Sequence, residues 1–279
     1  MTCGGTADQR PAFRTRFFDP STKCCTYLPT FPNFLVGRIL ADTSPAAAQG
    51  RLTTETRLNA GVGVTPLGIG VTPVFDVLYA VGAASHFGRS RALRCPHYLE
   101  DLGTCGVWQH REAVCTTFFC KFLRGAVGLR FWRTLRQLLS TVERELSVWC
   151  ALKVGMESEA ARRFLDAPLK PQMEAGDLDG VVDVDRRRRI WGSWFARERQ
   201  MFLQCAELVE RLHWADVQAI CGPRVTALAR LSEEAFAALE SRRIPGPLKV
   251  GPYRTLEVFA ESSIVESYRR QMRSNSRTR

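Results

Sequence analysis

The sequence predicts a mainly α-helical protein in which an irregular cysteine-cluster region of loops and short helices packs on a C-terminal helical bundle. Apolar residues recur at spacings of three and four along the C-terminal half, whereas six of the ten cysteines lie among turns between residues 24 and 120. The 279 residues, 45% of them hydrophobic, suffice for a core that needs no disulfide or metal for stability. We expect a cysteine-cluster metal-binding region at 1–123, a helical region at 124–266 and a basic disordered tail at 267–279.

The N-terminal region contains few long periodic patterns. Residues 51–60, RLTTETRLNA, read as a short helix. Residues 61–73, GVGVTPLGIGVTP, are expected to form an ordered loop, because each proline pushes the preceding residue out of helical geometry. This stretch is not a phosphate loop, since no Gly-Lys-Ser/Thr follows and the glycines do not fit Gly-x-Gly-x-x-Gly.

The C-terminal half carries the helical patterns. In its long first helix, tryptophan, leucine and valine recur on one face from Trp132 to Trp149. Residues 244–260 break the periodicity with glycine and proline and are expected to hold one short β element. The expected elements are a helix at 124–154, a loop at 167–185, and helices at 186–212, 215–220 and 232–242.

Two features predict a cytoplasmic protein that makes no membrane contact. The first residues, MTCGGTADQR, lack the apolar segment of a signal peptide. The longest weakly apolar stretch, 58–84, contains Asp76 and several glycines and prolines, which is not typical of a transmembrane helix. Thiols stay reduced in the cytoplasm, so the clustered cysteines indicate metal or redox chemistry rather than disulfides.

The net charge of +11 comes almost entirely from arginine, since five of the 39 cationic residues are lysines. This bias, together with abundant alanine and glycine, is typical of a GC-rich bacterial genome and weakens the interpretation of the charge as a nucleic-acid footprint. Four arginines at 186–189 open a predicted helix, where local ion pairs with Asp183 or Asp185 are favoured over a polyanion ligand. An unidentified protein is a possible partner, and nucleic acid is the weaker alternative.

Four cysteines lie in the segment RCPHYLEDLGTCGVWQHREAVCTTFFCK, residues 94–121. A soft metal needs thiolates that converge from different backbone segments, and turns or helix starts can direct them. An adjacent pair upstream adds two thiols, so six candidate metal ligands are available: Cys24, Cys25, Cys95, Cys105, Cys115 and Cys120. Outside this set, the thiols on apolar helix faces or at a helix end are expected to be core residues: Cys150, Cys205 and Cys221.

The segment resembles the YkgJ-type cysteine-cluster family, described as zinc- or iron-chelating. The family pattern runs Cys-Pro-x-Leu, Cys-x-Ile-Tyr and Arg-Pro-x-x-Cys. Its counterparts here are Cys95-Pro96 with Leu99, Cys105 with Val107 and Trp108, and Arg111 with Val114 and Cys115, with Glu112 in place of the proline. Of the family's upstream Cys-x-x-Cys-x-x-Cys-Cys, only the final pair is present, as Cys24-Cys25.

The resemblance implies a thiolate metal site. It favours Cys25, Cys95, Cys105 and Cys115 as ligands, with Cys24 and Cys120 as alternates or supports. Four thiolates would hold a [4Fe–4S] iron–sulfur cluster as readily as one zinc or iron ion. The aromatic residues of the segment would shield either from solvent, and this shielding tips the expectation slightly toward iron–sulfur.

Two alternatives stay open beside the metal-binding protein. A similar Cys-Cys plus Cys-Pro arrangement occurs in flagellin lysine N-methylases, regarded as iron–sulfur proteins, so the chain could be an iron–sulfur-dependent methyltransferase or redox enzyme. The other alternative is a thiol-based oxidant sensor without metal, in which Cys24 and Cys25 would be reactive.

Several neighbouring residues could support the site. Arg111 and Lys121 are expected to offset thiolate charge, and His97 and His110 are weaker candidates for ligands. By contrast, the acidic stretch at 175–185 does not fit a calcium loop, because Arg186 stands where the bidentate glutamate belongs. Its Asp183 or Asp185 is expected to cap the next helix instead.

Overall fold

A computed structural model describes residues 19, 21–118, 125–156, 175–241, 248–250 and 253–255. The fold is mainly helical, as the sequence predicts, and the described strands form small antiparallel sheets. The predicted tail at 267–279, Cys120 and Lys121 lie outside the described residues, as do residues 167–174 of the predicted loop at 167–185.

The N-terminal region is more regular than the sequence predicts. The predicted loop at 61–73 forms a hairpin that joins a third strand in the order β1-β3-β2. Gly68 allows this pairing, since its φ of 138° lies in a region that side-chain-bearing residues avoid, and a Cβ there would stand 1.9 Å from the Phe31 carbonyl oxygen. The elements are β1 Phe31–Pro32, α1 Asn33–Ala41, α2 Ala48–Ala60, β2 Val64–Thr65, β3 Gly68–Ile69 and α3 Pro73–His86.

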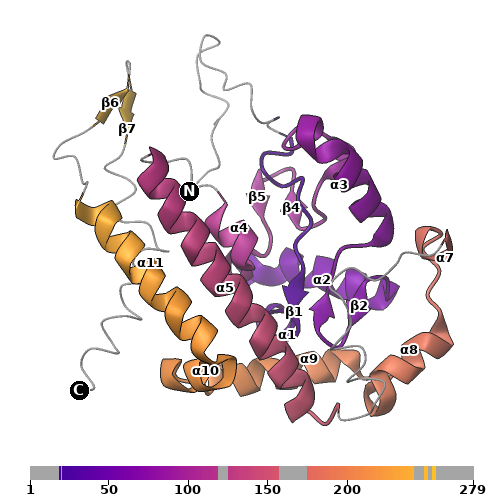
Figure 1. Ribbon diagram of the computed structural model, residues 1–279. Coiled ribbons are helices and arrows are strands. Elements are labelled where there is room, and N and C mark those ends of the chain that lie inside the picture. The colour runs from indigo at the N-terminus through magenta and orange to yellow at the C-terminus, as the bar shows by residue number, and fades with distance from the viewer. Residues whose placement is uncertain are drawn as a thin grey trace.

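Short elements follow in the cysteine-dense segment, as expected. β4 (Tyr98–Leu99) pairs antiparallel with β5 (Thr104–Cys105), and the short helix α4 covers Ala113–Thr117. Single turns of 3₁₀ helix lie at Pro45–Ala47, Arg91–Leu93 and Trp108–His110. In Figure 1 this segment lies between α3 on one side and the long helix α5 on the other.

The long helix predicted at 124–154 is α5, Gly125–Lys153. The predicted helix at 186–212 is wrong as a single element, because Gly192 (φ 52°) and Ala196 (φ 62°) take left-handed conformations that an α-helix cannot contain. The last helix begins at Pro223 rather than at 232, and two paired strands stand where one β element was expected. The remaining elements are α7 Ala175–Leu178, α8 Val184–Trp191, a 3₁₀ turn Gly192–Trp194, α9 Glu198–Glu210, α10 Trp214–Cys221, α11 Pro223–Ser241, β6 Leu248–Val250 and β7 Tyr253–Thr255.

Both halves of the chain contribute to the main core. Helix α1 packs closely on α9, and Gly37 permits this approach, since a Cβ there would stand 1.9 Å from the Phe202 carbonyl oxygen. Asn33, fully buried, donates hydrogen bonds to the carbonyl oxygens of Pro66 (3.0 Å) and Ser147 (2.8 Å) and so ties the start of α1 to α5. A second apolar cluster joins α5 to α11, which lie side by side in Figure 1.

The described helices include none with the length and apolar character that crossing a bilayer requires.

Candidate thiolate metal site

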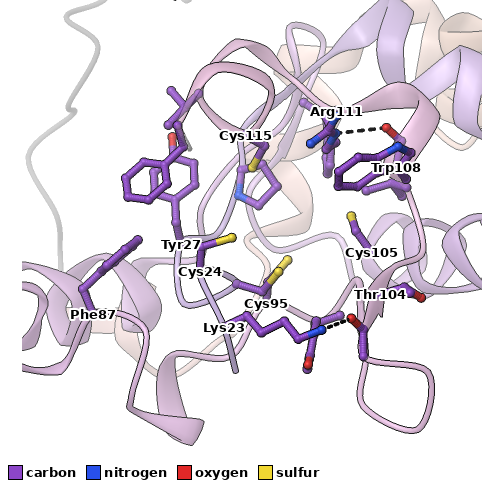
Figure 2. A pocket seen from close by; sticks show the side chains of 18 of the residues that line it. Lys23, Cys24, Tyr27, Phe87, Cys95, Thr104, Cys105, Trp108, Arg111 and Cys115 are labelled. Atoms are coloured by element: carbon purple, nitrogen blue, oxygen red, sulfur yellow. Dashed lines mark hydrogen bonds between the residues drawn. The ribbon is translucent and has the colours of Figure 1, made fainter. Parts of the chain in front are cut away.

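Five of the six candidate cysteines line one cavity of about 610 Å³: Cys24, Cys25, Cys95, Cys105 and Cys115. Figure 2 shows the sulfur atoms of Cys24, Cys95, Cys105 and Cys115 around a common central space. The sixth candidate, Cys120, lies outside the described residues. The thiols reach the cavity from a turn, a hairpin and a helix, so the site depends on how these three segments are held together.

The turn at 21–26 presents Cys24 and Cys25. Its two threonines are fully buried and form hydrogen bonds with Gly88, in the segment after α3. Thr22 Oγ1 donates to the Gly88 carbonyl oxygen at 2.8 Å, and Thr26 Oγ1 accepts from the Gly88 amide at 2.6 Å. Lys23 adopts a positive φ of 50°, which turns the chain so that the two cysteines follow directly. The adjacent cysteines are therefore placed by a rigid turn.

The segment that leads into the β4–β5 hairpin presents Cys95, and β5 presents Cys105. The Cys95 amide donates to the Cys25 carbonyl oxygen at 2.7 Å, which links this hairpin to the first turn. Tyr98 pairs with Cys105 in the ladder, and the Gly106 amide donates to the His97 carbonyl oxygen at 2.8 Å. This pairing brings two cysteines ten residues apart to neighbouring positions on the cavity wall.

Helix α4 presents Cys115 from its first turn. Glu112 caps the helix, and its carboxylate accepts from the amides of Val114 (2.6 Å) and Cys115 (2.7 Å). Glu112 thus stabilises the first turn of the helix that carries Cys115.

Burial changes the acidity of the thiols. The pKa of Cys95 is raised to about 12, chiefly by burial; the neighbouring Cys105 and Cys24 thiols also raise it, while the His97 amide and the Arg57 guanidinium lower it. Burial also holds the pKa of Cys115 well above its ordinary range, with Glu112 adding to the effect. Both thiols are therefore protonated at neutral pH in the metal-free chain, and a bound metal ion would displace their protons.

Two carboxyl groups lie behind the Cys115 helix. Burial, with a further contribution from Glu112, raises the pKa of Glu143 to about 9, although the Ala113 amide donates to its carboxylate. Burial likewise raises the pKa of Glu112, against the two amides that it caps. The pKa of Tyr27 is raised chiefly by burial, and the charges of Glu112 and Glu143 also raise it. This side of the cavity therefore disfavours additional negative charge.

The two histidines proposed as weaker ligands do not line the cavity. His97 is 1% exposed, and its Nδ1 lies 2.8 Å from Thr53 Oγ1. Its pKa is lowered to about 3, chiefly by burial and also by the positive charge of Arg57. His110 Nε2 lies 2.7 Å from the Asp42 carboxylate. Both side chains serve as structural partners of neighbouring segments.

The expected counter-charge Arg111 lies at the cavity, where its guanidinium stacks 3.4 Å from the centre of the Trp108 ring and Nε donates to the Trp108 carbonyl oxygen (Figure 2). Trp108 and Phe118, two aromatic residues of the cysteine segment, line the cavity. The sequence reasoning missed Tyr27, Tyr79, Phe87 and Arg136, which line the cavity too, and Arg57, which acts on Cys95 from behind. No local motif marks these residues, because they come from α2, α3, α5 and the adjoining loops, outside the cysteine segment.

In the described ranges, no group of three or more His, Cys, Asp or Glu side chains has the arrangement of a metal site. The thiols thus share a cavity and influence one another without standing as a closed ligand set.

Residues outside the cavity behave as the simpler interpretations predict. Cys150 and Cys205 are fully buried and Cys221 is partly buried in the core. Asp183 caps α8 through the Arg186 amide at 2.9 Å, and Arg188 lies 3.6 Å from Asp185, as expected. Arg187 pairs instead with Glu198 at 2.9 Å, a partner that the sequence did not predict.

Comparison with known proteins adds no relative. A scan of the chain against protein-family models gives no match, and searches of curated proteins and of solved structures find no significant match.

Proposed function

We propose that this protein binds a thiolate-ligated metal centre, an iron–sulfur cluster or a zinc or iron ion, in the cavity between the 21–26 turn, the β4–β5 hairpin and α4. The single observation that carries the proposal is the convergence of five cysteines, spread over 92 sequence positions, on one cavity. Cysteines that serve only as small core residues would not be expected to line one cavity with four other cysteines.

The proposed ligands are Cys95, Cys105 and Cys115, with the Cys24-Cys25 pair supplying the fourth. Cys120 stays an alternate ligand. The surroundings support a buried anionic centre, because aromatic side chains line the cavity and Arg57, Lys23 and Arg111 lie around the thiols. A thiolate centre of net negative charge is stabilised by such cations and by exclusion of water.

The second candidate is an iron–sulfur-dependent enzyme, either a methyltransferase or a redox enzyme. The observation that favours it is the size of the cavity, about 610 Å³, which falls within the range of small-molecule sites. A purely structural metal site is closed by its four ligands and has no adjoining space for a substrate.

The test is anaerobic purification of the full chain, followed by a visible absorption spectrum and elemental analysis of one sample. A brown protein with about four irons per chain supports a Cys-ligated cluster, and a colourless protein with one zinc supports a mononuclear site. Cys95→Ser and Cys105→Ser should each remove most of the metal, while the control Cys221→Ser, outside the cavity, should retain it. A wild-type protein without metal would overturn the proposal in favour of the oxidant sensor.

A further inference from the structure

The cavity is larger than the space that a metal centre bound by its thiols would occupy. A thiolate sulfur lies about 2.3 Å from a bound zinc ion, so a metal centre occupies only the space directly between the sulfurs. Cavities of about 300 to 1,000 Å³ typically hold small organic ligands. A volume of about 610 Å³ therefore leaves room for a second occupant beside the centre.

Aromatic rings line this space on two sides. Tyr27 and Tyr79 meet edge to face with ring centres 6.0 Å apart, and the rings of Phe87 and Phe118 are 5.1 Å apart. In Figure 2, Tyr27 and Trp108 lie on opposite sides of the cysteine sulfurs. Flat rings on two sides favour a planar, apolar or aromatic group between them.

Three cations complete the lining: Lys23, Arg111 and Arg136. Lys23 is held by the Gly103 carbonyl oxygen and Arg111 by its stacking on Trp108, so both charges have fixed places. Arg136 of α5 is half-buried and makes no hydrogen bond or ion pair with another described residue. The described residues that line the cavity include no aspartate or glutamate, and Glu112, which acts on Arg111, lies outside the lining.

The cation that acts most on the Cys95 thiol is a different one, Arg57. Arg57, outside the cavity lining, is the basic group among the charges that act most on Cys95, and none of the three lining cations is among the largest influences on Cys95 or Cys115. Lys23 and Arg111 also lie beside the thiols, and Arg111 acts on Glu112, so Arg136 is the lining cation that stands apart from the thiolate centre. Excess positive charge in an apolar cavity favours an anionic ligand.

We propose that the cavity binds a small aromatic carboxylate beside the thiolate centre, with the carboxylate next to Arg136 and Arg111 and the ring against the Tyr27–Phe118 side. This inference deepens the proposed function and rests on it, because it names the ligand class of the same site. Arginine suits the role, since its planar guanidinium binds a carboxylate through two parallel hydrogen bonds.

The test uses para-fluorobenzoate as the probe and fluorine NMR as the readout on the full-length, anaerobically purified protein. The matched neutral probe is para-fluorobenzamide, which has the same ring without the charge. We expect the benzoate to bind at least about tenfold more tightly than the amide, because hydrogen bonds between charged groups are stronger than those to a neutral amide. Equal affinities would overturn the proposal, and this comparison needs no variant.

Two variants on one helix locate the site. Arg136→Gln should weaken benzoate binding about tenfold, whereas Arg133→Gln, exposed on α5 and not part of the cavity lining, should leave it unchanged. Equal losses in both variants would point to general surface charge and contradict the proposal. If Arg136→Gln does not fold, as circular dichroism would reveal, the comparison of the two probes on the wild-type protein decides alone.

Metal analysis of the same samples separates the two proposals. Loss of metal in Arg136→Gln but not in Arg133→Gln would mean that Arg136 serves the metal centre, which overturns the anion inference. Metal-loaded wild type that does not distinguish benzoate from benzamide overturns the inference and leaves the metal function standing. Benzoate binding by a protein without metal supports the anion site while the metal function fails.

Discussion

The Cys95 amide donates a hydrogen bond of 2.7 Å to the Cys25 carbonyl oxygen. This bond joins the turn that carries the adjacent cysteines to the hairpin that carries Cys95 and Cys105. The two cysteine segments are therefore fixed to each other by backbone, and their thiols face one cavity even without a bound ion.

The adjacent pair provides the first prediction. The Cys24 thiol acts on Cys95 and its sulfur lies in the central space of Figure 2, so we expect Cys24→Ser to lower the metal content by at least about half. Cys25→Ser should have the smaller effect, because the Cys25 backbone already serves the hairpin. Metal analysis of both variants decides, and a larger loss in Cys25→Ser would instead support the ligand that the family resemblance favours.

The second prediction concerns Gly50 of α2. A Cβ at Gly50 would stand 2.0 Å from the carbonyl oxygen of Gly106, the residue after Cys105. Gly50→Ala should therefore displace the β5 turn, lower the free energy of unfolding by about 1 to 3 kcal/mol and reduce the bound metal. Gly176→Ala is the control, since a Cβ there meets nothing within 4 Å. Urea unfolding and elemental analysis measure both, and a Gly50→Ala protein with wild-type stability would contradict this packing.

The third prediction tests the connection between α1 and α5. Asn33→Ala removes the donors to the Pro66 and Ser147 carbonyl oxygens and leaves two acceptors buried without them. We expect a loss of about 2 to 3 kcal/mol in the free energy of unfolding, because a buried polar group without its partner keeps its desolvation cost. The exposed Asn59→Ala should change stability by less than about 0.5 kcal/mol. Similar unfolding midpoints for the two variants would contradict a stabilising role of the buried Asn33 side-chain amide.

The fourth prediction is a pH dependence at Glu143. Its pKa rises from 4.5 to about 9 on folding, chiefly through burial and then through Glu112, so the folded chain retains a proton that the unfolded chain releases. The contribution of this carboxyl to stability therefore falls as the pH rises from about 4.5 to 9. Tyr27, which is close enough to sense Glu143, stays neutral throughout this range because its own pKa is raised.

Glu143→Gln removes the ionisation and keeps the shape. The free energy of unfolding of this variant, relative to that of the wild type, should increase by at least about 1 kcal/mol as the pH rises from 5 to 9. Thermal or urea unfolding at several pH values measures the difference. Glu233→Gln, exposed on α11, is the control and should show no such trend. A difference that stays constant with pH would mean that Glu143 is not held protonated.

The helical patterns of the C-terminal half were predictable, because a helix that buries one face must repeat its apolar residues every three to four positions. The helix predicted at 124–154 corresponds to α5 within a residue at each end. The predicted helix at 186–212 failed where Gly192 and Ala196 turn the chain, since the apolar spacing continues across a break that depends on two backbone angles. The strands β2 and β3 were missed because two-residue strands carry too few residues for an alternating pattern.

By itself, the sequence determined the helical character of the protein, the grouping of its cysteines and the chemistry open to them, because composition and spacing are local properties. Only the tertiary structure decided which side chains share the cavity. Tyr27, Tyr79, Phe87 and Arg136 reach it from separate elements, and Arg57 approaches Cys95 from behind. His97, a candidate ligand by residue type, lies buried against Thr53 instead. Such placements follow from the packing of helices and turns far apart in the chain, and this packing minimises buried unsatisfied polar groups over the whole molecule rather than within any one segment.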